Sequence, residues 1–318
     1  MKTVIIGLGV IGKVHYEVLS SSEYNVVAIC DVDEKVKAQV SGVKFYTDYK
    51  LMIEEVKPDV VHICTPHYLH KEMVLYCLER DINVVCEKPL CIKKDDIQEI
   101  LTAEKKSKAK LGICFQNRFL ERNAYVKEYL QDKKVVSAIA TLAWNRGKEY
   151  YSQASWRGTK NEEGGGVLIN QAIHTIDLLV YLLGMPDYVT ASVSNLSLKG
   201  VIEVEDSAIV LCTGKVNFSV FATNANNVYL PVDVLIKTET ETIRLLDDKM
   251  EINGKPVEFA SKKALGKECY GSGHGTFIEE FYNAIKTGEK FLIDGQEGSK
   301  ALRIVLSAYE SNGNKIKI

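Results

Sequence analysis

Three glycines near the start of the chain constrain its fold more than any other feature. They form the run Gly7-Leu8-Gly9-Val10-Ile11-Gly12, which directly follows a short apolar stretch and opens an amphipathic one. A strand before such a run and a helix after it are the context of a dinucleotide-binding turn. Gly7 would permit the tight turn, Gly9 would let the backbone approach a pyrophosphate, and Gly12 would let helix and strand pack closely. The sequence therefore predicts a nucleotide-binding unit at this point.

Asp31 supports the same interpretation, because it lies 19 residues beyond Gly12, at the end of the next apolar run. A carboxylate there can accept hydrogen bonds from both adenosine ribose hydroxyls and repels the 2′-phosphate of NADP. We therefore expect NAD as the cofactor, with NADP disfavoured. The alternative is that Asp31 only begins a turn with Asp33, which is compatible with cofactor binding but removes the preference for NAD.

Six short apolar runs, separated by amphipathic stretches, continue this pattern up to about residue 118. The alternation is expected of parallel strands joined by crossover helices, and runs rich in valine and isoleucine indicate a sheet covered on both faces. The runs are residues 3–6, 25–30, 43–46, 59–64, 83–86 and 111–115. We predict an α/β protein whose first domain, residues 1–118, is a Rossmann domain with a doubly wound parallel sheet.

The pattern changes after a helix expected at about residues 120–130. Longer β-rich segments with tight turn signals follow, and they predict a large, mostly antiparallel open sheet in an α+β domain of residues 119–318. A large sheet with one uncovered face tends to acquire a partner, so we expect a homodimer or homotetramer assembled through it. The segments are 136–144, 188–196, 207–213, 218–222, 232–237, 242–246 and 250–252, followed by helices near 276–286 and 296–311.

The composition is that of an ordinary globular protein and argues against several classes of function. The 40 basic and 42 acidic side chains nearly cancel, and the basic ones form only short clusters, so we expect no nucleic-acid partner. We also expect no membrane span and no export signal. No two of the eight cysteines have the two-residue spacing of a zinc or redox motif, and Cys30, Cys64, Cys86 and Cys114 lie late in apolar runs. These thiols are predicted to be reduced core residues of a cytoplasmic protein.

Polar residues follow the fourth expected strand, at the edge of the sheet where the cofactor should lie. Thr65 and Pro66 end that strand, and a Thr cap with Pro at the first helical position would explain the pair structurally. Because the carboxyl edge of the sheet binds the cofactor, we expect Thr65, Pro66 and His70 also to line one of its ribose groups.

Lys88 is the first candidate for chemistry, since Glu87-Lys88-Pro89 ends the fifth expected strand at the same edge. When an alcohol loses a hydride and its proton, a cation near the oxygen stabilises the developing negative charge. The alternative is an ordinary solvated lysine after a strand. The residues predicted to bind the cofactor are Gly7, Gly9, Val10, Ile11, Gly12, Asp31, Thr65, Pro66, His70, Glu87, Lys88 and Asn117.

A polar stripe on an otherwise apolar helix supplies the second candidate. On a regular helix, Asn170, His174, Asp177 and Tyr181 fall within an arc of roughly 60°. His174 can exchange protons near neutral pH, so we predict a catalytic role, the alternative being a structural core histidine. A zinc site made by His174, Asp177 and His274 would lack a complete local ligand pattern, and no metal is predicted.

Other polar and aromatic residues are expected to line a substrate pocket with this stripe. His274 belongs to the same segment as Tyr270 and is a weaker candidate for this pocket. The predicted substrate-binding residues are Arg118, Trp156, Arg157, Asn170, Asp177 and Tyr270.

Taken together, these residues resemble the Gfo/Idh/MocA family, named after glucose-fructose oxidoreductase, inositol dehydrogenase and the rhizopine catabolism protein. The resemblance covers most of the chain and implies a Rossmann domain followed by an α/β domain whose open sheet mediates dimers or tetramers. It further implies that Lys88 and His174 flank the substrate, with hydride exchanged at a nicotinamide ring. The matching motifs, in family order, are GLGVIG, Asp31, TPHYLH, EKP, QNR, WR, GGG with its His and Asp, and YGSGHG.

One residue departs from the family pattern. Family dehydrogenases often carry Asp four residues before the histidine, whereas this chain has Asn170. An amide can orient His174, but it cannot take up a proton or stabilise an imidazolium as a carboxylate does. Three alternatives therefore stay open. Lys88 and His174 suffice for proton transfer, Asp177 takes a share, or Asn170 marks a substrate class outside simple cyclitol oxidation.

Three functions remain compatible with the sequence. The first is NAD-dependent oxidation of a secondary alcohol on a sugar, nucleotide sugar or cyclitol, or the reverse reduction. The second is NAD-assisted glycoside cleavage, in which transient oxidation acidifies a C–H bond and permits elimination. The third is a non-catalytic regulator that responds to NAD.

Overall fold

The computed structural model describes residues 1–247, 249–259 and 272–318, and they form two compact units. The first unit comprises residues 1–119 and 272–299, and the second comprises 120–259 and 300–318. We predicted one boundary, after residue 118, but the chain returns to the first unit near its end. The returning helix α8 (Gly273–Thr287) buries Phe277, Phe281 and Tyr282 and packs against α1 and β6, which explains the return.

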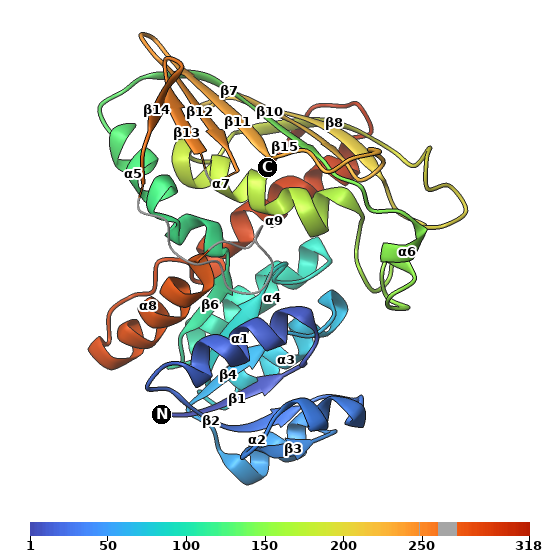
Figure 1. The fold of residues 1–318 in the computed structure, drawn as a ribbon, viewed down its shortest axis with the longest axis vertical. Coiled ribbons are helices and arrows are strands. Elements are labelled where there is room, and N and C mark those ends of the chain that lie inside the picture. Colours follow the sequence, from blue (N-terminus) through green and yellow to red (C-terminus); the bar gives the residue numbers. More distant parts are fainter. Residues whose placement is uncertain (248, 260–271) are drawn as a thin grey trace. The chain divides into compact units, whose positions relative to one another are not determined.

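A six-stranded parallel sheet forms the core of the first unit, which confirms the predicted doubly wound fold (Figure 1). Its order is β3-β2-β1-β4-β5-β6, so the direction of winding reverses next to β1, the usual position of a ligand crevice. The two strands β4 and β6 are buried along their whole length, as expected when helices cover both faces. The strands are β1 (Lys2–Ile6), β2 (Asn25–Cys30), β3 (Lys44–Tyr46), β4 (Val60–Ile63), β5 (Asn83–Glu87) and β6 (Leu111–Cys114).

The crossover segments of the first unit are helical. A 3-10 turn η2 (His67–Leu69) precedes α3, and another, η3 (Gln116–Phe119), follows β6. The turn η1 (Glu34–Gln39) joins β2 to β3. The helices are α1 (Val10–Ser20), α2 (Tyr49–Val56), α3 (His70–Leu78) and α4 (Lys94–Lys106).

A nine-stranded sheet forms the core of the second unit, in the order β14-β13-β12-β11-β7-β10-β9-β8-β15. Every pairing is antiparallel except that of β7 with β10, which confirms the predicted mostly antiparallel sheet. The strands are β7 (Val135–Ala143), β8 (Tyr188–Ser194), β9 (Ser207–Thr213), β10 (Phe218–Thr223), β11 (Asp233–Thr238), β12 (Thr242–Leu246), β13 (Lys249–Ile252), β14 (Lys255–Val257) and β15 (Ile316–Lys317).

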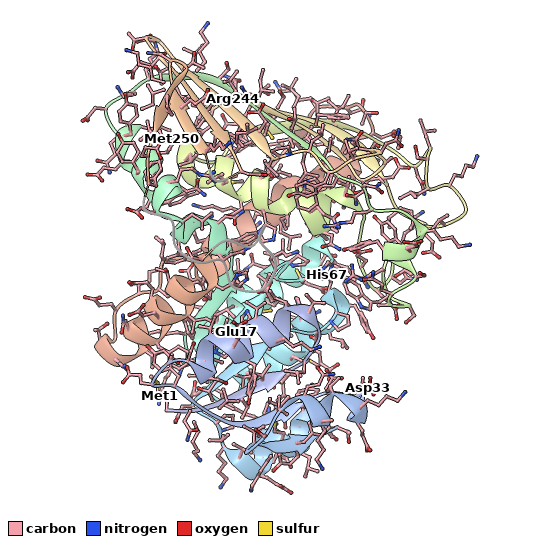
Figure 2. All side chains as sticks on the ribbon, in the orientation of Figure 1. Met1, Glu17, Asp33, His67, Arg244 and Met250 are labelled. Carbon is pink, nitrogen blue, oxygen red and sulfur yellow. The ribbon has the colours of Figure 1, made fainter. Side chains whose placement is uncertain are left out.

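The large sheet has one covered and one exposed face. Burial alternates along its strands, as in Ser207–Thr213. Met250 is buried on β13, whereas Arg244 on the neighbouring β12 is exposed (Figure 2). The other helices of the chain are α5 (Glu121–Tyr129), α6 (Lys148–Tyr151), α7 (Ile173–Leu183) and α9 (Gly295–Ser311).

Two further sequence predictions concern cysteines and membranes. The seven cysteines in the described part of the chain are all free and buried. No helix within 1–247, 249–259 or 272–318 combines the length and the apolar character that a bilayer span requires.

Candidate cofactor and catalytic site

The glycine run forms a tight turn between β1 and α1. Gly7 has φ +89°, and a Cβ built on it would lie 2.6 Å from the carbonyl oxygen of Cys64. A Cβ on Gly12 would collide with the carbonyl oxygen of Gly7, so side chains at both positions are excluded by packing. A Cβ on Gly9 would meet no atom within 4 Å. Gly7 and Gly12 therefore shape the turn, while Gly9 keeps its outer side open.

The N-terminus of α1 fits a dinucleotide phosphate group. Its N-cap, Gly9, makes no side-chain cap hydrogen bond, and the first turn holds no acidic residue. The leading backbone N–H groups, including those of Val10 and Ile11, and the positive end of the helix dipole favour an anion at this place. The residues present therefore fit the pyrophosphate of NAD.

Asp31 holds the glycine turn in place. Its Oδ2 accepts the backbone N–H of Leu8 at 2.6 Å, and its Oδ1 accepts that of Asp33 at 2.9 Å. The predicted turn at Asp31 is therefore present. It coexists with the cofactor interpretation, because each carboxylate oxygen has a further lone pair for a ribose hydroxyl.

The loop after β4 differs from the predicted capped helix. Pro66 precedes the 3-10 turn η2, α3 begins only at His70, and the Thr65 hydroxyl lies 3.5 Å from the sulfur of Met73. The predicted Thr cap is wrong, because the intervening turn separates Thr65 from the helix. His70 is fully buried, with Nδ1 2.7 Å from the Pro89 carbonyl oxygen and Nε2 2.9 Å from that of Thr65. His70 therefore ties two loops together and has no surface with which to line a ribose.

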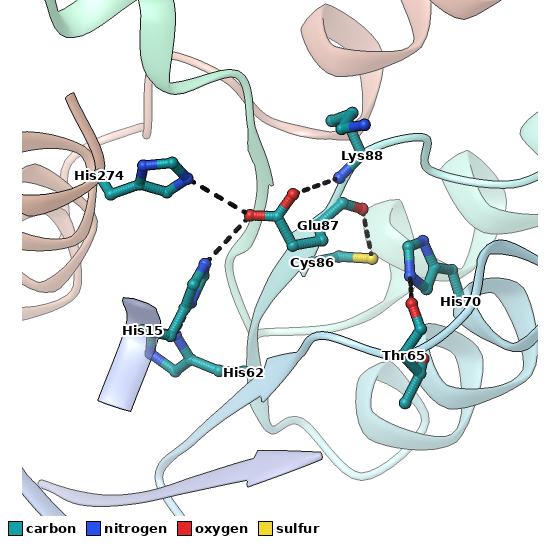
Figure 3. Close-up of polar contacts among 8 residues, drawn as sticks. All are labelled: His15, His62, Thr65, His70, Cys86, Glu87, Lys88 and His274. Carbon is teal, nitrogen blue, oxygen red and sulfur yellow. Dashed lines mark hydrogen bonds and ion pairs between the residues drawn. The ribbon is translucent and has the colours of Figure 1, made fainter. Parts of the chain in front are cut away.

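Glu87 lies at the centre of a buried polar cluster (Figure 3). Its Oε1 is 3.1 Å from Nε2 of His15 and 3.8 Å from Nε2 of His274, and its Oε2 accepts the backbone N–H of Lys88 at 3.3 Å. Burial acts to raise the pKa of Glu87, but the hydrogen bond and charge of His15, with the charges of His274 and Lys88, hold it below its usual value. Glu87 is thus an ionised group inside the unit, and its contact with the cofactor stays a prediction.

A chain of hydrogen bonds extends this cluster through the core. Nδ1 of His15 lies 2.8 Å from Nδ1 of His62, and Nε2 of His62 lies 3.1 Å from the hydroxyl of Tyr282. That hydroxyl is 2.7 Å from Oγ1 of Thr3. Two facing imidazole nitrogens need one proton between them, so the hydrogen bonds along the chain are directional and coupled.

The two histidines next to Glu87 and His15 also respond to burial. Burial, with the charge of His15 as a further cause, holds the pKa of His62 well below its usual value. Burial lowers the pKa of His274 to about 4. Both rings are therefore neutral at physiological pH.

Four neighbouring side chains are of types that bind zinc. They are His15, Glu87, Cys114 and His274. Their ligand atoms lie within 4.8 Å of one another, and all four side chains are buried. Tetrahedral zinc brings its ligand atoms to roughly 3.3–3.8 Å from one another, given Zn–N and Zn–S bonds of about 2.0–2.3 Å. The hydrogen bond between His15 and Glu87 explains the observed arrangement without an ion.

Sequence analysis did not anticipate this cluster. Its members come from α1, β4, β5, β6 and α8, so no local spacing connects them. A signal was nevertheless present, because His15 and His62 are polar residues within otherwise apolar stretches.

Lys88 follows β5 directly, at the carboxyl edge of the sheet as predicted, and its peptide bond to Pro89 is cis. Its charge acts on both Glu87 and His274. Asn117 and Arg118 lie in η3, after β6. Arg118 is buried, with its guanidinium 3.0 Å from Glu297 at the start of α9, and its contact with a substrate stays a prediction.

The predicted polar stripe in the second unit is not carried by one regular α-helix. Residues Leu168–Ala172 form a π-helical turn, and α7 begins at Ile173. The wider π turn changes the angular step, so Asn170 does not keep the predicted register with His174. Asp177 is buried on α7, whereas His174 and Tyr181 are partly exposed.

A buried carboxylate lies beside Asn170. Nδ2 of Asn170 donates to Oε1 of Glu163, whose Oε2 accepts the backbone N–H of Gly158. Sequence analysis missed Glu163, although it directly precedes the three glycines. The amide of Asn170 is thus held by a carboxylate seven residues earlier in the chain.

The three consecutive glycines at positions 164–166 pack closely against a second buried carboxylate, Glu205, and its neighbour Tyr309. Backbone N–H groups of Gly166 and Leu168 donate to Glu205, and the hydroxyl of Tyr309 donates to it at 2.9 Å. A Cβ on Gly165 would collide with the Tyr309 hydroxyl. Burial raises the pKa of Glu205.

Trp156 and Arg157 lie in the loop after α6. The guanidinium carbon of Arg157 is 5.2 Å from the centroid of the Trp156 ring. Tyr270, also predicted to bind substrate, lies outside the described residues.

Two family models match the chain. Residues 1–115 match the model described as "Oxidoreductase family, NAD-binding Rossmann fold", and residues 126–253 match the GFO/IDH/MocA C-terminal domain. The chain belongs to the Gfo/Idh/MocA family.

Curated relatives in the Gfo/Idh/MocA family include dehydrogenases of sugars and cyclitols. The chain is 31% identical over 195 residues to D-glucoside 3-dehydrogenase of Escherichia coli, a match that spans 58% of this chain and 55% of that protein. It is 23% identical to myo-inositol 2-dehydrogenase of Thermotoga maritima, over 98% of this chain and 96% of that one.

Solved structures of the family share the whole fold. The WlbA dehydrogenase of Chromobacterium violaceum, solved with NADH and UDP-GlcNAcA, is 27% identical and superposes with a TM-score of 0.86 over 100% of this chain and 96% of that one. Levoglucosan dehydrogenase with NADH, at 21% identity, has a TM-score of 0.87. With the open N-terminus of α1 and the family model, these findings establish an NAD-binding oxidoreductase of the Gfo/Idh/MocA family.

Proposed function

We propose that this protein oxidises a secondary alcohol of a sugar, nucleotide sugar or cyclitol, or reduces the corresponding ketone, with Lys88 and His174 as its catalytic residues. The observation that carries the proposal is the position of Lys88, directly after β5 at the edge of the sheet where the glycine turn opens. Named relatives act as dehydrogenases on glucosides and inositol.

The residues of the first unit would hold and polarise the substrate oxygen. NAD, when bound at the glycine turn, supplies the hydride acceptor. The ammonium of Lys88 lies near the alcohol oxygen and stabilises negative charge there as the proton leaves. Glu87 acts as a positioning residue, because its carboxylate accepts the backbone N–H of Lys88 and its buried negative charge favours the ammonium form.

The residues of the second unit would receive the proton. His174 on α7 takes it at a ring nitrogen, and Asn170 orients the site with its amide held by Glu163. Glu163 thereby supplies a buried carboxylate next to the amide that replaces the frequent family aspartate. Asp177, Trp156 and Arg157 contact the substrate in this proposal.

NAD is the preferred cofactor in this proposal, because Asp31 would repel a 2′-phosphate. In this proposal, the cofactor is contacted by the turn around Gly7, Gly9 and Gly12, by Asp31, and by Thr65, Pro66 and Asn117. Reduced buried thiols are compatible with a cytoplasmic protein.

The exposed face of the large sheet supports a homodimer or homotetramer. Leu235 and Ile139 face each other on neighbouring strands, as do Phe221 and Ile209, and all four are exposed. Contiguous apolar surface of this kind is typical of a subunit interface. Sedimentation velocity of the wild type and of Ile139→Asp tests it, since a monomeric wild type contradicts the proposal.

A screen of sugars, cyclitols and nucleotide sugars for NADH formation, run with NAD and with NADP, tests the function. We expect turnover with NAD and a fall of about 100- to 1000-fold in kcat in Lys88→Met. A product released without net NADH would favour the glycoside-cleaving alternative. Full biological activity in a Lys88→Met, His174→Ala double variant that still binds NAD would favour the regulator.

A further inference from the structure

Two arginines of the second unit lie beside one tyrosine ring. The guanidinium carbon of Arg157 is 4.3 Å from the centroid of the Tyr150 ring, and that of Arg146 is 5.0 Å from it. Arg146 also lies 5.3 Å from the ring of Trp144. Neither guanidinium forms an ion pair with any residue in the described part of the chain.

Aromatic contacts leave part of each guanidinium unsatisfied. A cation–π contact uses the face of the group, whereas its N–H donors lie in its plane. The Nε atoms of Arg146 and Arg157 and the indole nitrogen of Trp144 are buried without an acceptor among the described residues. Buried donors need an acceptor, so one from outside the chain would complete this cluster.

The buried carboxylate beside Asn170 already has hydrogen-bond donors of its own. Glu163 is fully buried and accepts hydrogen bonds from the backbone of Gly158 and the amide of Asn170. Two guanidinium cations thus lie beside one tyrosine ring and form no ion pair among the described residues. The surplus positive charge favours an anion.

Tyr150 connects this cluster to the proposed catalytic helix. Its hydroxyl oxygen lies 3.5 Å from Nδ2 of Asn170 and 3.3 Å from Nε2 of Gln171. Both amides belong to the π turn that leads into α7 and His174. The arginines are thus next to the residues that the proposed function assigns to the substrate.

We propose that Arg146 and Arg157 bind an anionic group of the substrate, so that the protein acts on acidic sugars, carrying a carboxylate or a phosphate, in preference to neutral ones. The inference rests on the proposed dehydrogenase function and adds the charge class of its substrate. Guanidinium forks match carboxylate and phosphate oxygens alike. The aromatic rings beside them suit the apolar face of a sugar.

Matched pairs of ligands test the inference. D-Glucose is compared with D-glucuronate and with D-glucose 6-phosphate, and UDP-glucose with UDP-glucuronate, by NADH formation and by calorimetric binding in the presence of NADH. At least one member with the added acidic group should bind or react about tenfold better than its matched counterpart. The two glucuronate comparisons report a carboxylate and glucose 6-phosphate reports a phosphate, so the set identifies the source of the charge.

Substitutions test whether the two arginines cause the preference for acidic ligands. Arg146→Gln and Arg157→Gln should each weaken binding of the acidic ligand by about 10- to 100-fold, the range of a lost charged hydrogen bond, and so remove the preference. Arg157→Lys keeps the charge and should retain part of it. Arg244→Gln is the matched control, because Arg244 lies in the same unit but is paired with Asp233 at 2.8 Å.

The outcomes separate this inference from the proposed function. Lys88→Met should lose turnover and keep the binding preference, whereas Arg157→Gln should lose the preference. If the wild type turns over sugars but treats acidic and neutral members alike, or if the arginine variants keep the preference, the inference is wrong and the dehydrogenase function stands. An acidic preference in binding with no turnover of any member supports the arginine site and contradicts the function.

Discussion

The two units hold charged side chains in opposite ways. In the first unit, the buried carboxylate of Glu87 lies beside His15, His274 and the backbone of Lys88, so it has polar partners within the fold. In the second unit, Arg146 and Arg157 are partly buried beside aromatic rings and form no ion pair among the described residues. A cluster with partners inside the fold fixes geometry for chemistry, whereas cations without an ion pair are suited to a ligand that brings an anion.

If this contrast is correct, removing Glu87 should have the largest effect on stability. Glu87→Gln should lower the free energy of unfolding by about 1–3 kcal/mol, because it replaces a buried carboxylate that lies beside His15, His274 and the backbone of Lys88. Urea denaturation at pH 7 measures this. Glu104 provides the control, because burial raises its pKa to about 7 and a neutral amide there should cost far less. Equal losses in the two variants would mean that the Glu87 cluster has no special role.

His274 should make the first unit sensitive to pH. Because burial lowers its folded pKa to about 4, the unfolded chain binds more protons than the folded one between that value and 6.5. Stability should therefore rise with pH across this window, with up to about 3 kcal/mol from this residue. Thermal unfolding of wild type and His274→Gln between pH 4 and 7 measures the slope, and the variant should show a flatter curve. Parallel curves would show that His274 does not contribute.

Arg157 should contribute little to stability if it serves a ligand. Arg157→Gln loses a cation–π contact but also removes a partly buried cation whose Nε has no acceptor among the described residues, so the free energy of unfolding should change by less than about 1 kcal/mol. Urea denaturation without ligand checks this. A loss as large as that of Glu87→Gln would make the arginine a structural residue and remove the contrast between the units.

Gly9 in the glycine turn should show the smallest effect on stability. Gly9→Ala has open space around the new methyl group, so the unfolding free energy should change by no more than about 1 kcal/mol while the Kd for NAD rises. In Gly12→Ala the methyl group meets the Gly7 carbonyl, so the fold itself should be destabilised. Denaturation and NADH fluorescence titration separate the two effects. An unchanged Kd in Gly9→Ala would place the phosphates elsewhere.

Local patterns predicted both sheets well. Short apolar runs anticipated the strands from β1 to β6, and the alternating segments anticipated most strands of the large sheet. The return of α8 to the first unit was not visible, because it depends on packing between residues far apart in sequence. The π turn at Leu168–Ala172 was also missed, since one wider turn leaves the apolar pattern almost unchanged.

The candidate site was predicted less completely than the fold. The glycines and Lys88 lie where strand order places them, because parallel strands end at one edge. The burial of Glu87, His70 and Arg118 was not predicted, since their partners, among them His274 and Glu297, belong to other segments. Sequence spacing cannot reveal such partners.

The late return of the chain affects how this protein can be divided. The polypeptide crosses between its units three times, so neither unit is encoded by one uninterrupted stretch. A fragment ending near residue 118 would lack α8 and leave the apolar surface beneath Phe281 without cover. A chimera that exchanges cofactor preference between relatives would therefore need two segments from the same parent. These are residues 1–119 and the later segment that ends at Ser299.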